Sequence, residues 1–270
     1  MRGFGRTLRL VRRASRPAPA PPAARGLTVR ETDVFLVSYP RSGNTWLRFL
    51  LANALRPSEQ ATFANFGEVV PDIYDESDRD LLRRPSPRVL KSHEPFDESY
   101  RRVLYVVRHP ADVAVSYYHY LIKTRQIPPG YDVAWFVESY VDGRLDGFGT
   151  WGEHVGGWLD ARGGDDEFVL LRYEDVLEAP ETALRAALKL VGTEIGDAAV
   201  AQAVSRSTAD ELRRLERETG AALPTFRASR LEDPFIRYAR AGMASEELPP
   251  ALVEQIVDAW PGVLARVGYE

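Results

Sequence analysis

Four short apolar runs, each followed by polar residues and a helical stretch, constrain the fold of this chain more than any other feature. Their β-branched and aliphatic residues are typical of buried strands. The runs are Val34–Val37, Arg88–Leu90, Val103–Val107 and Phe168–Leu171. Apolar strands that alternate with helices indicate a parallel sheet covered on both faces. The sequence therefore predicts an α/β fold with three layers, in which helices flank a central, mostly parallel sheet.

Helical patterns lie between and after these runs. One covers Thr45–Leu55, and another begins at Pro110, where a proline in the first turn with Asp112 beside it is common at helix N-termini. This second helix runs to about Ile122. Further helices are predicted at about 180–191, 197–203, 208–217 and 249–259.

The charge of the chain is distributed unevenly. Its 270 residues include 35 basic and 39 acidic side chains, and residues 1–30 hold eight arginines and no acid. The remaining 240 residues hold 27 basic and 39 acidic side chains, which gives a net charge of −12. Nucleic-acid binding requires a basic face, so we expect no nucleic-acid partner for this body. We divide the chain into a basic N-terminal arm, residues 1–30, and a single domain, residues 31–270.

The arm is rich in proline, alanine and arginine, with four prolines between Ser15 and Gly26. Proline at this density prevents a helix or a paired strand, so we expect a disordered, solvated arm. Two alternatives stay open: an arm that contacts a membrane surface or a partner, and a cleaved targeting peptide.

Cysteines and long apolar segments are both missing from the sequence. The lack of cysteine excludes a disulfide scaffold, a thiolate zinc site and a cysteine nucleophile, and it fits a reducing compartment. No run approaches the ~18 apolar residues that a transmembrane helix needs. We therefore expect a cytoplasmic protein that is soluble, with at most a peripheral membrane contact through the arm.

Polar side chains that can do chemistry follow each of the four predicted strands. They are Arg41 and Ser42, Lys91 and His93, Arg108, and Tyr173. In parallel α/β sheets, ligands bind beyond the carboxyl ends of the strands. Polar residues also follow strands wherever a chain turns in water, but four such clusters at one sheet edge favour a binding site.

The segment Tyr39–Trp46 (YPRSGNTW) joins the first predicted strand to its helix. Free N–H groups and the positive end of the helix dipole make such a junction an anion site, and Gly43 lets the backbone approach an oxyanion. Its polar side chains are those of Arg41, Ser42, Asn44 and Thr45. We expect a P-loop-like fold, although a Walker A loop would need glycine in place of Ser38 and lysine in place of Asn44. As an isolated motif, the segment is equally compatible with an ordinary turn.

As a whole, this octet resembles the 5′-phosphosulfate loop (YPKSGTTW) of the sulfotransferases that use 3′-phosphoadenosine 5′-phosphosulfate (PAPS). Three further stretches resemble that family in the same order along the chain. They are Lys91-Ser92-His93, the segment Arg108–Ser116, and the turn Tyr173-Glu174-Asp175. The resemblance extends from about Asp33 to the C-terminus, and it implies one sulfotransferase domain that uses PAPS as its donor and needs no metal.

The resemblance implies which residues carry the chemistry. His93 would be the general base that takes a proton from the acceptor, a task suited to a histidine. Lys91 would approach the transferring sulfuryl group as a compact charge. Most family members carry lysine at the position of Arg41. Arginine can clamp the phosphosulfate with two hydrogen bonds, but it holds its proton, which puts proton transfer from this residue in doubt.

The resemblance also assigns the remaining donor contacts. Arg108 and Ser116 would bind the 3′-phosphate, and Trp46 and Tyr173 would lie near the adenine. The 5′-phosphosulfate would be held by Arg41, Ser42, Gly43, Asn44 and Thr45. Without the family, an ion pair for Arg108, a neutral helix position for Ser116 and core packing for the two aromatic residues are the ordinary alternatives.

The chain departs from the family pattern in its last third. Ser207-Thr208-Ala209 replaces a T/S-S-F turn near the adenine, so an aromatic stacking partner is missing. The late 3′-phosphate loop of the family, R-K-G-x-x-G-D-W, is reduced to Arg240-Ala241-Gly242 without the lysine and the G-D-W. We favour Arg240 and Gly242 as donor-binding residues because the glycine then fits. An alignment on Arg237 is the alternative.

The acceptor site is the least defined part of the sequence. Ten aromatic residues between positions 117 and 158 could line a slot for a hydrophobic or aromatic alcohol, although core packing is the ordinary role of each. Residues 60–80 and 220–236 are expected to cover that slot as lids. We predict a sulfotransferase that moves a sulfuryl group from PAPS to a hydroxyl or amine of a small acceptor. The alternatives are a P-loop kinase and a catalytically weak nucleotide-binding protein of the same fold, and the acceptor and the oligomeric state stay open.

Overall fold

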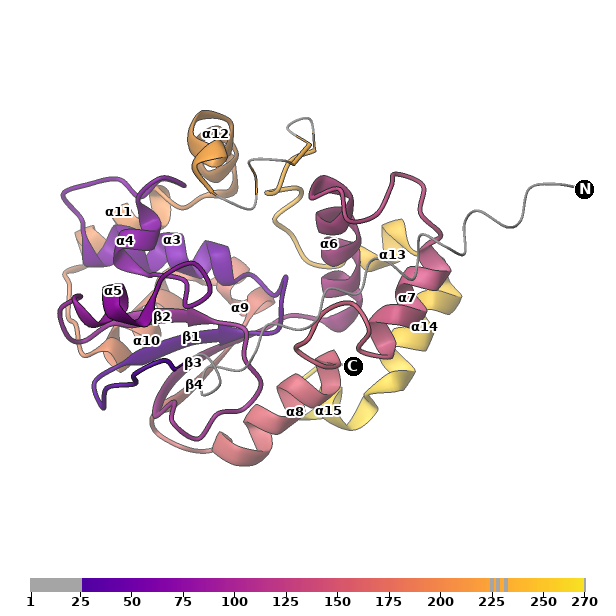
Figure 1. Cartoon of the computed structure of the whole chain (residues 1–270), viewed down its shortest axis with the longest axis horizontal. Coiled ribbons are helices and arrows are strands. Elements are labelled where there is room, and N and C mark those ends of the chain that lie inside the picture. The colour runs from indigo at the N-terminus through magenta and orange to yellow at the C-terminus, as the bar shows by residue number, and fades with distance from the viewer. Residues whose placement is uncertain (1–25, 224–225, 227–228, 231–232, 270) are drawn as a thin grey trace, which may run out of the picture.

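The computed structural model describes residues 26–223, 226, 229–230 and 233–269, and the predicted arm up to residue 25 lies outside the described residues. In this part of the chain, four strands form one parallel sheet in the order β2-β1-β3-β4. The strands are β1 (Val34–Ser38), β2 (Val89–Ser92), β3 (Arg102–Val107) and β4 (Phe168–Arg172). The predicted α/β fold with a parallel sheet flanked by helices is confirmed (Figure 1).

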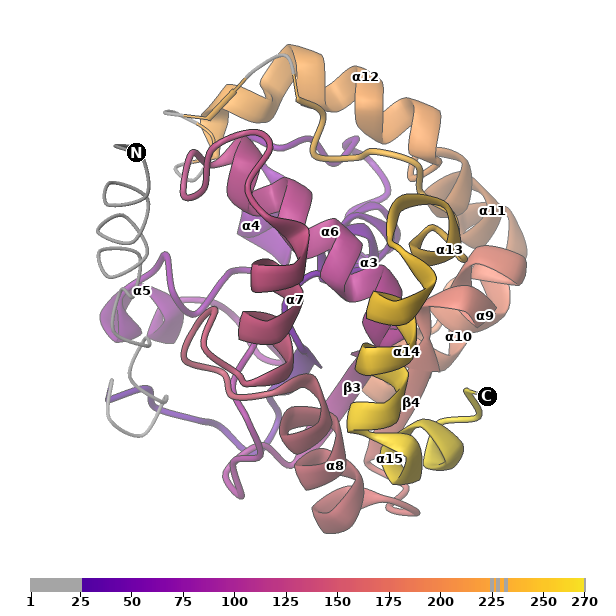
Figure 2. The same ribbon diagram turned by 90° about the vertical axis from the view of Figure 1, so that its right-hand side faces the viewer.

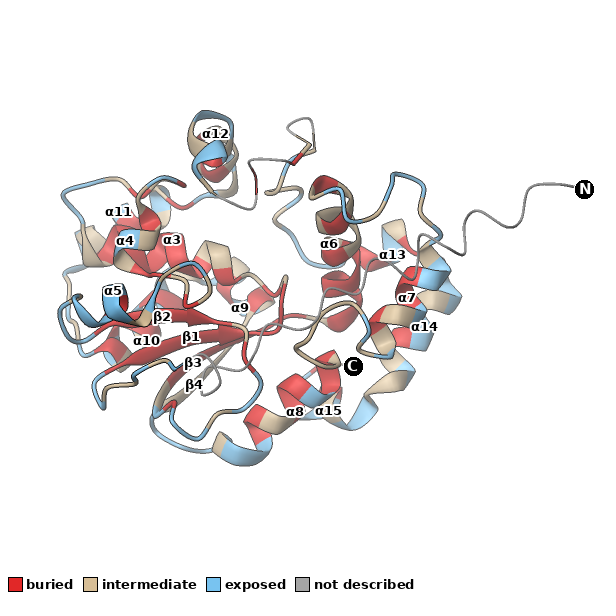
Figure 3. Ribbon diagram, viewed as in Figure 1, coloured by how far each residue is buried: buried red, intermediate tan, exposed pale blue. Residues whose placement is uncertain are grey.

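Side chains alternate between the two faces of the sheet and enter two separate cores. Phe35 and Tyr105 belong to the core that includes α6 (Pro110–Lys123), α7 (Val133–Val141), α8 (Trp151–Arg162), α14 (Pro250–Ala259) and α15 (Pro261–Arg266). Leu36 and Leu104 belong to the core that includes α3 (Asn44–Leu55), α9 (Tyr173–Glu178), α10 (Pro180–Val191) and α11 (Asp197–Ser205). Figure 3 shows that buried residues fill β1, β2 and β3 and the helix faces turned inward.

A third apolar cluster holds α12 (Ala209–Thr219) against α3 and α4 (Phe66–Val69), on the outer side of α3 (Figure 1 and Figure 2). The remaining short helices are α5 (Asp78–Leu82), η1 (Gly220–Ala222) and α13 (Ala244–Glu247). Thr28, which the sequence placed in the arm, donates from its backbone N–H and its hydroxyl to the carboxylate of Asp78 in α5 (2.7 and 2.9 Å). None of the described helices is long and apolar enough to cross a membrane.

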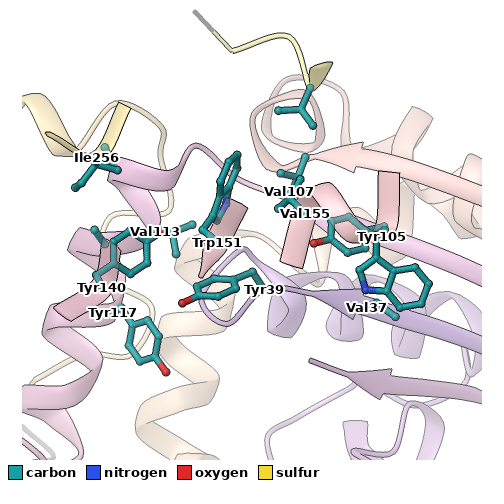
Figure 4. Packing of buried hydrophobic residues seen from close by; sticks show 14 of the residues in the cluster. Val37, Tyr39, Tyr105, Val107, Val113, Tyr117, Tyr140, Trp151, Val155 and Ile256 are labelled. Atoms are coloured by element: carbon teal, nitrogen blue, oxygen red, sulfur yellow. The ribbon is translucent and has the colours of Figure 1, made fainter. Parts of the chain in front are cut away.

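The first core also fixes the loops that follow β1 and β3. The indole N–H of Trp151 donates to the backbone carbonyl of Arg108 (3.2 Å). The ring of Tyr39, the first residue after β1, lies edge-on to Tyr140 with ring centroids 6.1 Å apart. Figure 4 shows these aromatic side chains packed together with Tyr105 and Val107 of β3. The two loops are therefore anchored by buried aromatic residues of the first core.

Candidate active site

A cavity of about 370 Å³ lies where β1, β2 and β3 end. Its walls come from the loop after β1, the ends of the strands, α6, α9 and the segment 235–243. The predicted site residues that line it are Arg41, Gly43, Asn44, Thr45, Trp46, Lys91, His93, Arg108, Ser116, Tyr173 and Arg240. The structure thus brings together residues far apart in the sequence. Among the predicted residues, Ser42 and Gly242 do not line the cavity: Ser42 is buried and Gly242 is exposed.

The loop after β1 turns sharply into α3. Arg41 (φ +71°) and Gly43 (φ +106°) adopt the left-handed region, and Gly43 caps the helix. A Cβ atom at Gly43 would lie 2.6 Å from Cδ2 of Tyr173, so only glycine fits between the loop and this ring. The Asn44 amide donates to the hydroxyl of Ser38 (3.2 Å) and holds the loop onto β1. The N–H groups of Asn44 and Thr45, the first two of α3, precede the helical hydrogen-bond ladder, and both residues line the cavity.

Arg41 crosses the cavity from the loop to α6. Its Nε donates to the hydroxyl of Ser116 (3.2 Å). Its guanidinium lies 4.7 Å from the ring centroid of Tyr120 and 4.3 Å from that of Phe235. Burial lowers the pKa of Arg41 to about 10, so the side chain keeps its charge at neutral pH.

The end of β1 selects one tautomer of His93. Its Nδ1 lies 2.7 Å from the backbone carbonyl oxygen of Ser38. A carbonyl oxygen can only accept a hydrogen bond, so the proton is assigned to Nδ1 and Nε2 keeps its lone pair. Burial, reinforced by the charge of Lys91, holds the pKa of His93 well below its usual value. The imidazole is therefore neutral at physiological pH and has a free basic nitrogen.

Aromatic rings fix the orientation of this imidazole. The rings of Tyr74 and Phe148 lie 6.3 and 5.8 Å from it, centroid to centroid. The backbone N–H of His93 donates to the hydroxyl of Tyr74 (2.9 Å). Behind it, the Nε2 of His154 lies 2.9 Å from the backbone carbonyl of His93. The histidine is thus restrained through its ring and through its backbone.

Lys91 is buried in the cavity wall, with 7% of its surface exposed. Its Nζ lies 2.9 Å from Oδ2 of Asp72 and 4.5 Å from the ring centroid of Tyr74. Nη1 of Arg48 lies 4.0 Å from the same carboxylate oxygen. Burial lowers the pKa of Lys91, and the neighbouring carboxylate of Asp72 opposes that shift.

Arg108 sits on the opposite side of the cavity and joins it to the late loop of the chain. Its Nη2 lies 3.3 Å from Oδ2 of Asp112 and donates to the backbone carbonyl of Arg240 (3.1 Å). Asp112 also accepts from the backbone N–H of Gly242 (2.8 Å). The guanidinium lies over the ring of Tyr173 at 4.4 Å, and its buried Nε has no hydrogen-bond partner among the described residues.

Two arginines of the late segment line the cavity, and both have acidic partners. Arg240 is exposed and pairs with Glu246 (2.6 Å). Arg237 pairs with Glu247 (2.7 Å), whose other oxygen lies 2.6 Å from Nε2 of His119. The geometry therefore keeps both arginines as candidates for a phosphate at this end.

The turn Ser207-Thr208-Ala209, which departs from the family pattern, holds the side chain of Trp46. Its indole N–H donates to the backbone carbonyl of Ser207 (2.9 Å), and its ring meets Tyr173 edge-on at 5.7 Å. A backbone carbonyl, which any residue type supplies, thus holds the ring at this turn.

Several residues of the cavity were not predicted from the sequence. Asp72 and Asp75 carry two carboxylates into it, and Ser38 orients His93. Of the ten aromatic residues considered, Tyr117, Tyr120 and Phe148 line the cavity. Tyr140, Trp151 and Trp158 are fully buried in the core. Residues from both expected lid segments reach the cavity, among them Phe66, Phe226 and Phe235.

The chain is similar to known sulfotransferases in sequence. The family described as "Sulfotransferase domain" matches residues 31–265. Sulfotransferase 2B1 of Mus musculus is 25% identical over 229 residues, which cover 79% of this chain and 66% of that protein. Sulfotransferase 1E1 of Bos taurus is 26% identical over 241 residues, which cover 84% of this chain and 81% of that protein. The chain thus spans about two thirds of the length of the first of these relatives.

Solved structures show the same fold. A mouse sulfotransferase complexed with PAP, adenosine 3′,5′-bisphosphate, aligns with a TM-score of 0.68 and 21% identity, over 89% of this chain and 87% of that one. Retinol dehydratase in complex with androsterone and the inactive cofactor PAP aligns with a TM-score of 0.73 and 18% identity, over 89% of this chain and 82% of that one. At these identities the likeness establishes the fold.

Proposed function

This chain belongs to the sulfotransferase domain family, and on that premise we propose that it transfers a sulfuryl group from PAPS to a hydroxyl or amine of a small acceptor in the cytoplasm. One observation carries the proposal. A neutral histidine with a free Nε2, His93, lines the same cavity as Arg41, Lys91 and Arg108 and the N-terminus of α3. A base for the acceptor and positive charge for the donor are thus combined in one space.

The residues of the cavity fit a donor with phosphate groups at two ends. The loop after β1 offers helix N–H groups and Arg41 to a phosphosulfate. Arg108 offers a buried Nε–H that has no partner in the described part of the chain. Ser116, whose hydroxyl accepts from Nε of Arg41, lines the same cavity. Trp46 and Tyr173 line the same cavity with their rings edge-on at 5.7 Å, and they offer aromatic surface to an adenine. PAPS, when bound, supplies the sulfuryl group and departs as PAP.

The neutral side chain of His93 and the positively charged side chains of Lys91 and Arg41 have different roles in the proposed reaction. His93 takes the acceptor proton on Nε2 while Ser38 keeps the proton on Nδ1. Lys91 and Arg41 place positive charge where the leaving phosphate gains negative charge. Because these charges come from side chains, we expect the reaction to need no metal and to survive treatment with a chelator.

The acceptor side of the cavity favours a hydrophobic or aromatic alcohol. Its apolar wall is formed by Tyr117, Tyr120, Phe148, Phe226 and Phe235. Aromatic walls with a few polar groups are typical of small-molecule sites. Retinol dehydratase has been solved with androsterone and with retinol, both small hydrophobic molecules, which supports the same class here.

Two measurements test the proposed function. Thermal stability should rise with PAP more than with ATP and magnesium, and labelled PAPS should sulfate members of a panel of alcohols, phenols and amines. No stabilisation by PAP would overturn the proposal, and a preference for ATP with magnesium would favour a kinase. Stabilisation by PAP without transfer to any acceptor would favour a nucleotide-binding protein that has lost its activity.

A further inference from the structure

The backbone places a carboxylate beside the lysine that we propose for the sulfuryl group. The N–H of Lys91 donates to the carbonyl of Pro71 (2.8 Å), and the N–H of Ile73 donates to the carbonyl of Lys91 (3.2 Å). Residues 71–73 thus run parallel to β2, with Asp72 opposite Lys91. The separation of 2.9 Å between Oδ2 of Asp72 and Nζ of Lys91 follows from this register.

We propose that Asp72 is a positioning residue that keeps Lys91 charged and directs its ammonium group along the cavity wall until the donor binds. This role rests on the proposed function of Lys91. Lys91 is 7% exposed as a residue, so its amine loses hydration, and a nearby carboxylate favours the charged form.

Because Arg48 also lies near Asp72, Lys91 can move away without leaving the carboxylate of Asp72 unpaired. The Nε and Nη2 of Arg48 both donate to the carbonyl of Val70 (3.0 and 2.8 Å), and its guanidinium lies 4.1 Å from the ring centroid of Phe66. This arginine is therefore fixed 4.0 Å from Asp72, whereas Lys91 is held by one ion pair and a ring contact. When Lys91 turns to a sulfuryl group, Asp72 keeps Arg48 as a partner.

The charged and titratable groups that face Lys91 come from three elements. They are Arg48 of α3, Asp72, Tyr74 and Asp75 of the adjoining segment, and His93 after β2. Asp72 is the group in direct contact, and Asp75 is the matched carboxylate that lines the same cavity farther out. Substitution of Asp72 removes the carboxylate that contacts Lys91. Substitution of Asp75 removes a carboxylate that lines the cavity without contacting Lys91, and it serves as the control.

The chain has only three lysines, which makes the charge of Lys91 directly measurable. The full chain labelled with [13Cε]-lysine should give three resonances, assigned with single lysine-to-arginine substitutions. In Asp72→Asn, the titration midpoint of Lys91 should fall by about one to three pH units. The midpoints of Lys123, which pairs with Glu216, and of the exposed Lys189 should not move. Asp75→Asn should shift the Lys91 midpoint by less than half as much.

Activity links this charge to the reaction. With labelled PAPS and the best acceptor of the panel, the alkaline limb of kcat in Asp72→Asn should move to lower pH by the same amount as the Lys91 midpoint. Asp72→Glu should restore both, and it keeps the test open if the asparagine variant folds poorly. An unmoved midpoint, or a moved midpoint with an unmoved alkaline limb, overturns the positioning role. A wild-type chain that neither binds PAP nor transfers the label overturns the proposed function instead, and the lysine titration tells the two failures apart.

Discussion

Strand β2 carries a buried ion pair at each end, and the surroundings of the two pairs differ. At its amino end, Arg88 donates from Nε to Oδ1 of Asp33 (2.8 Å) and from Nη2 to the carbonyl of Thr28 (2.9 Å). Both side chains of that pair are at most 1% exposed. At its carboxyl end, Lys91 meets Asp72 in the wall of a cavity of about 370 Å³. One pair is enclosed, and the other can be reached by a ligand.

The difference shows how the same chemistry serves two purposes in a parallel sheet. The forked guanidinium of Arg88 ties the start of β1 to the start of β2 through directed hydrogen bonds, which suits a permanent contact. The single ammonium of Lys91 can rotate toward a different anion. We infer that the amino edge of the sheet serves stability and the carboxyl edge serves binding and chemistry, and each prediction below tests one side of that division.

The largest expected effect is at the carboxyl edge. In His93→Gln the amide can still donate to the carbonyl of Ser38, but the free basic nitrogen is lost. Removing a general base costs roughly 10²–10⁴-fold in rate, and kcat for sulfation should fall by that factor. The free energy of unfolding and the Kd for PAP should stay close to those of the wild type. Retained turnover would remove His93 from the role of base.

A comparable free-energy change is expected at the amino edge, but in stability. Arg88→Ala leaves the carboxylate of Asp33 buried without its partner, and breaking such a pair costs about 3–5 kcal/mol. Urea denaturation measures the loss. Arg102→Ala is the control, since its pair with Glu167 (3.3 Å) is partly exposed to solvent and should contribute less than about 1 kcal/mol. Equal losses in the two variants would contradict a special role for the enclosed pair.

Much of the fold could be predicted because buried parallel strands need unbroken apolar runs. The four predicted strands and the helices α3, α6, α10, α11, α12 and α14 match the observed bounds within two residues. Helix α8 was missed because three of its residues are glycine, which weakens a helical pattern. A Cβ atom at Gly152 would lie 2.2 Å from the ring of Trp260. Glycine is therefore required here by a residue far away in the sequence, and no local pattern indicates that contact.

The candidate site also contains residues that could be predicted from the sequence and residues that could not. Arg41, His93 and Arg108 follow strand ends, and Lys91 is the second-last residue of β2. A parallel sheet brings strand ends together, so their shared location was predictable. Asp72 could not be found by such reasoning, because it reaches Lys91 through a short run of chain that pairs with β2 outside any regular strand. Residues that position the proposed catalytic side chains through tertiary contacts therefore could not be predicted from local sequence patterns.

The next effect concerns pH and a histidine that supports His93. His154 is 1% exposed; its Nε2 lies 2.9 Å from the carbonyl of His93, and its Nδ1 lies 2.7 Å from the hydroxyl of Tyr105. Burial lowers its pKa to about 4, below the value of about 6.5 expected for the unfolded chain. The unfolded state therefore binds more protons below pH 6.5, so this contribution is complete above that pH and is lost as the pH falls toward 4.

The expected loss from this one group is about 3 kcal/mol between pH 6.5 and 4. Urea denaturation at a series of pH values measures it, and the difference in slope between the wild type and His154→Gln isolates the histidine. A wild-type slope no steeper than that of the variant would show that His154 is not held neutral. The result decides whether a group at the carboxyl edge can also serve stability.

The smallest expected effect separates backbone strain from a ring contact in the donor loop. Gly43→Ala and Gly192→Ala both place a side chain at positive φ (+106° and +79°), which costs about 1–2 kcal/mol of stability in each. Only at Gly43 does the new Cβ meet the ring of Tyr173, at 2.6 Å, since nothing lies within 4 Å at Gly192. Displacing that ring from Arg108 should weaken PAP binding by about tenfold, roughly 1.4 kcal/mol by calorimetry, in the Gly43 variant alone. If PAP bound both variants equally well, Tyr173 would have no part in holding the donor, and the loop would act through its backbone only.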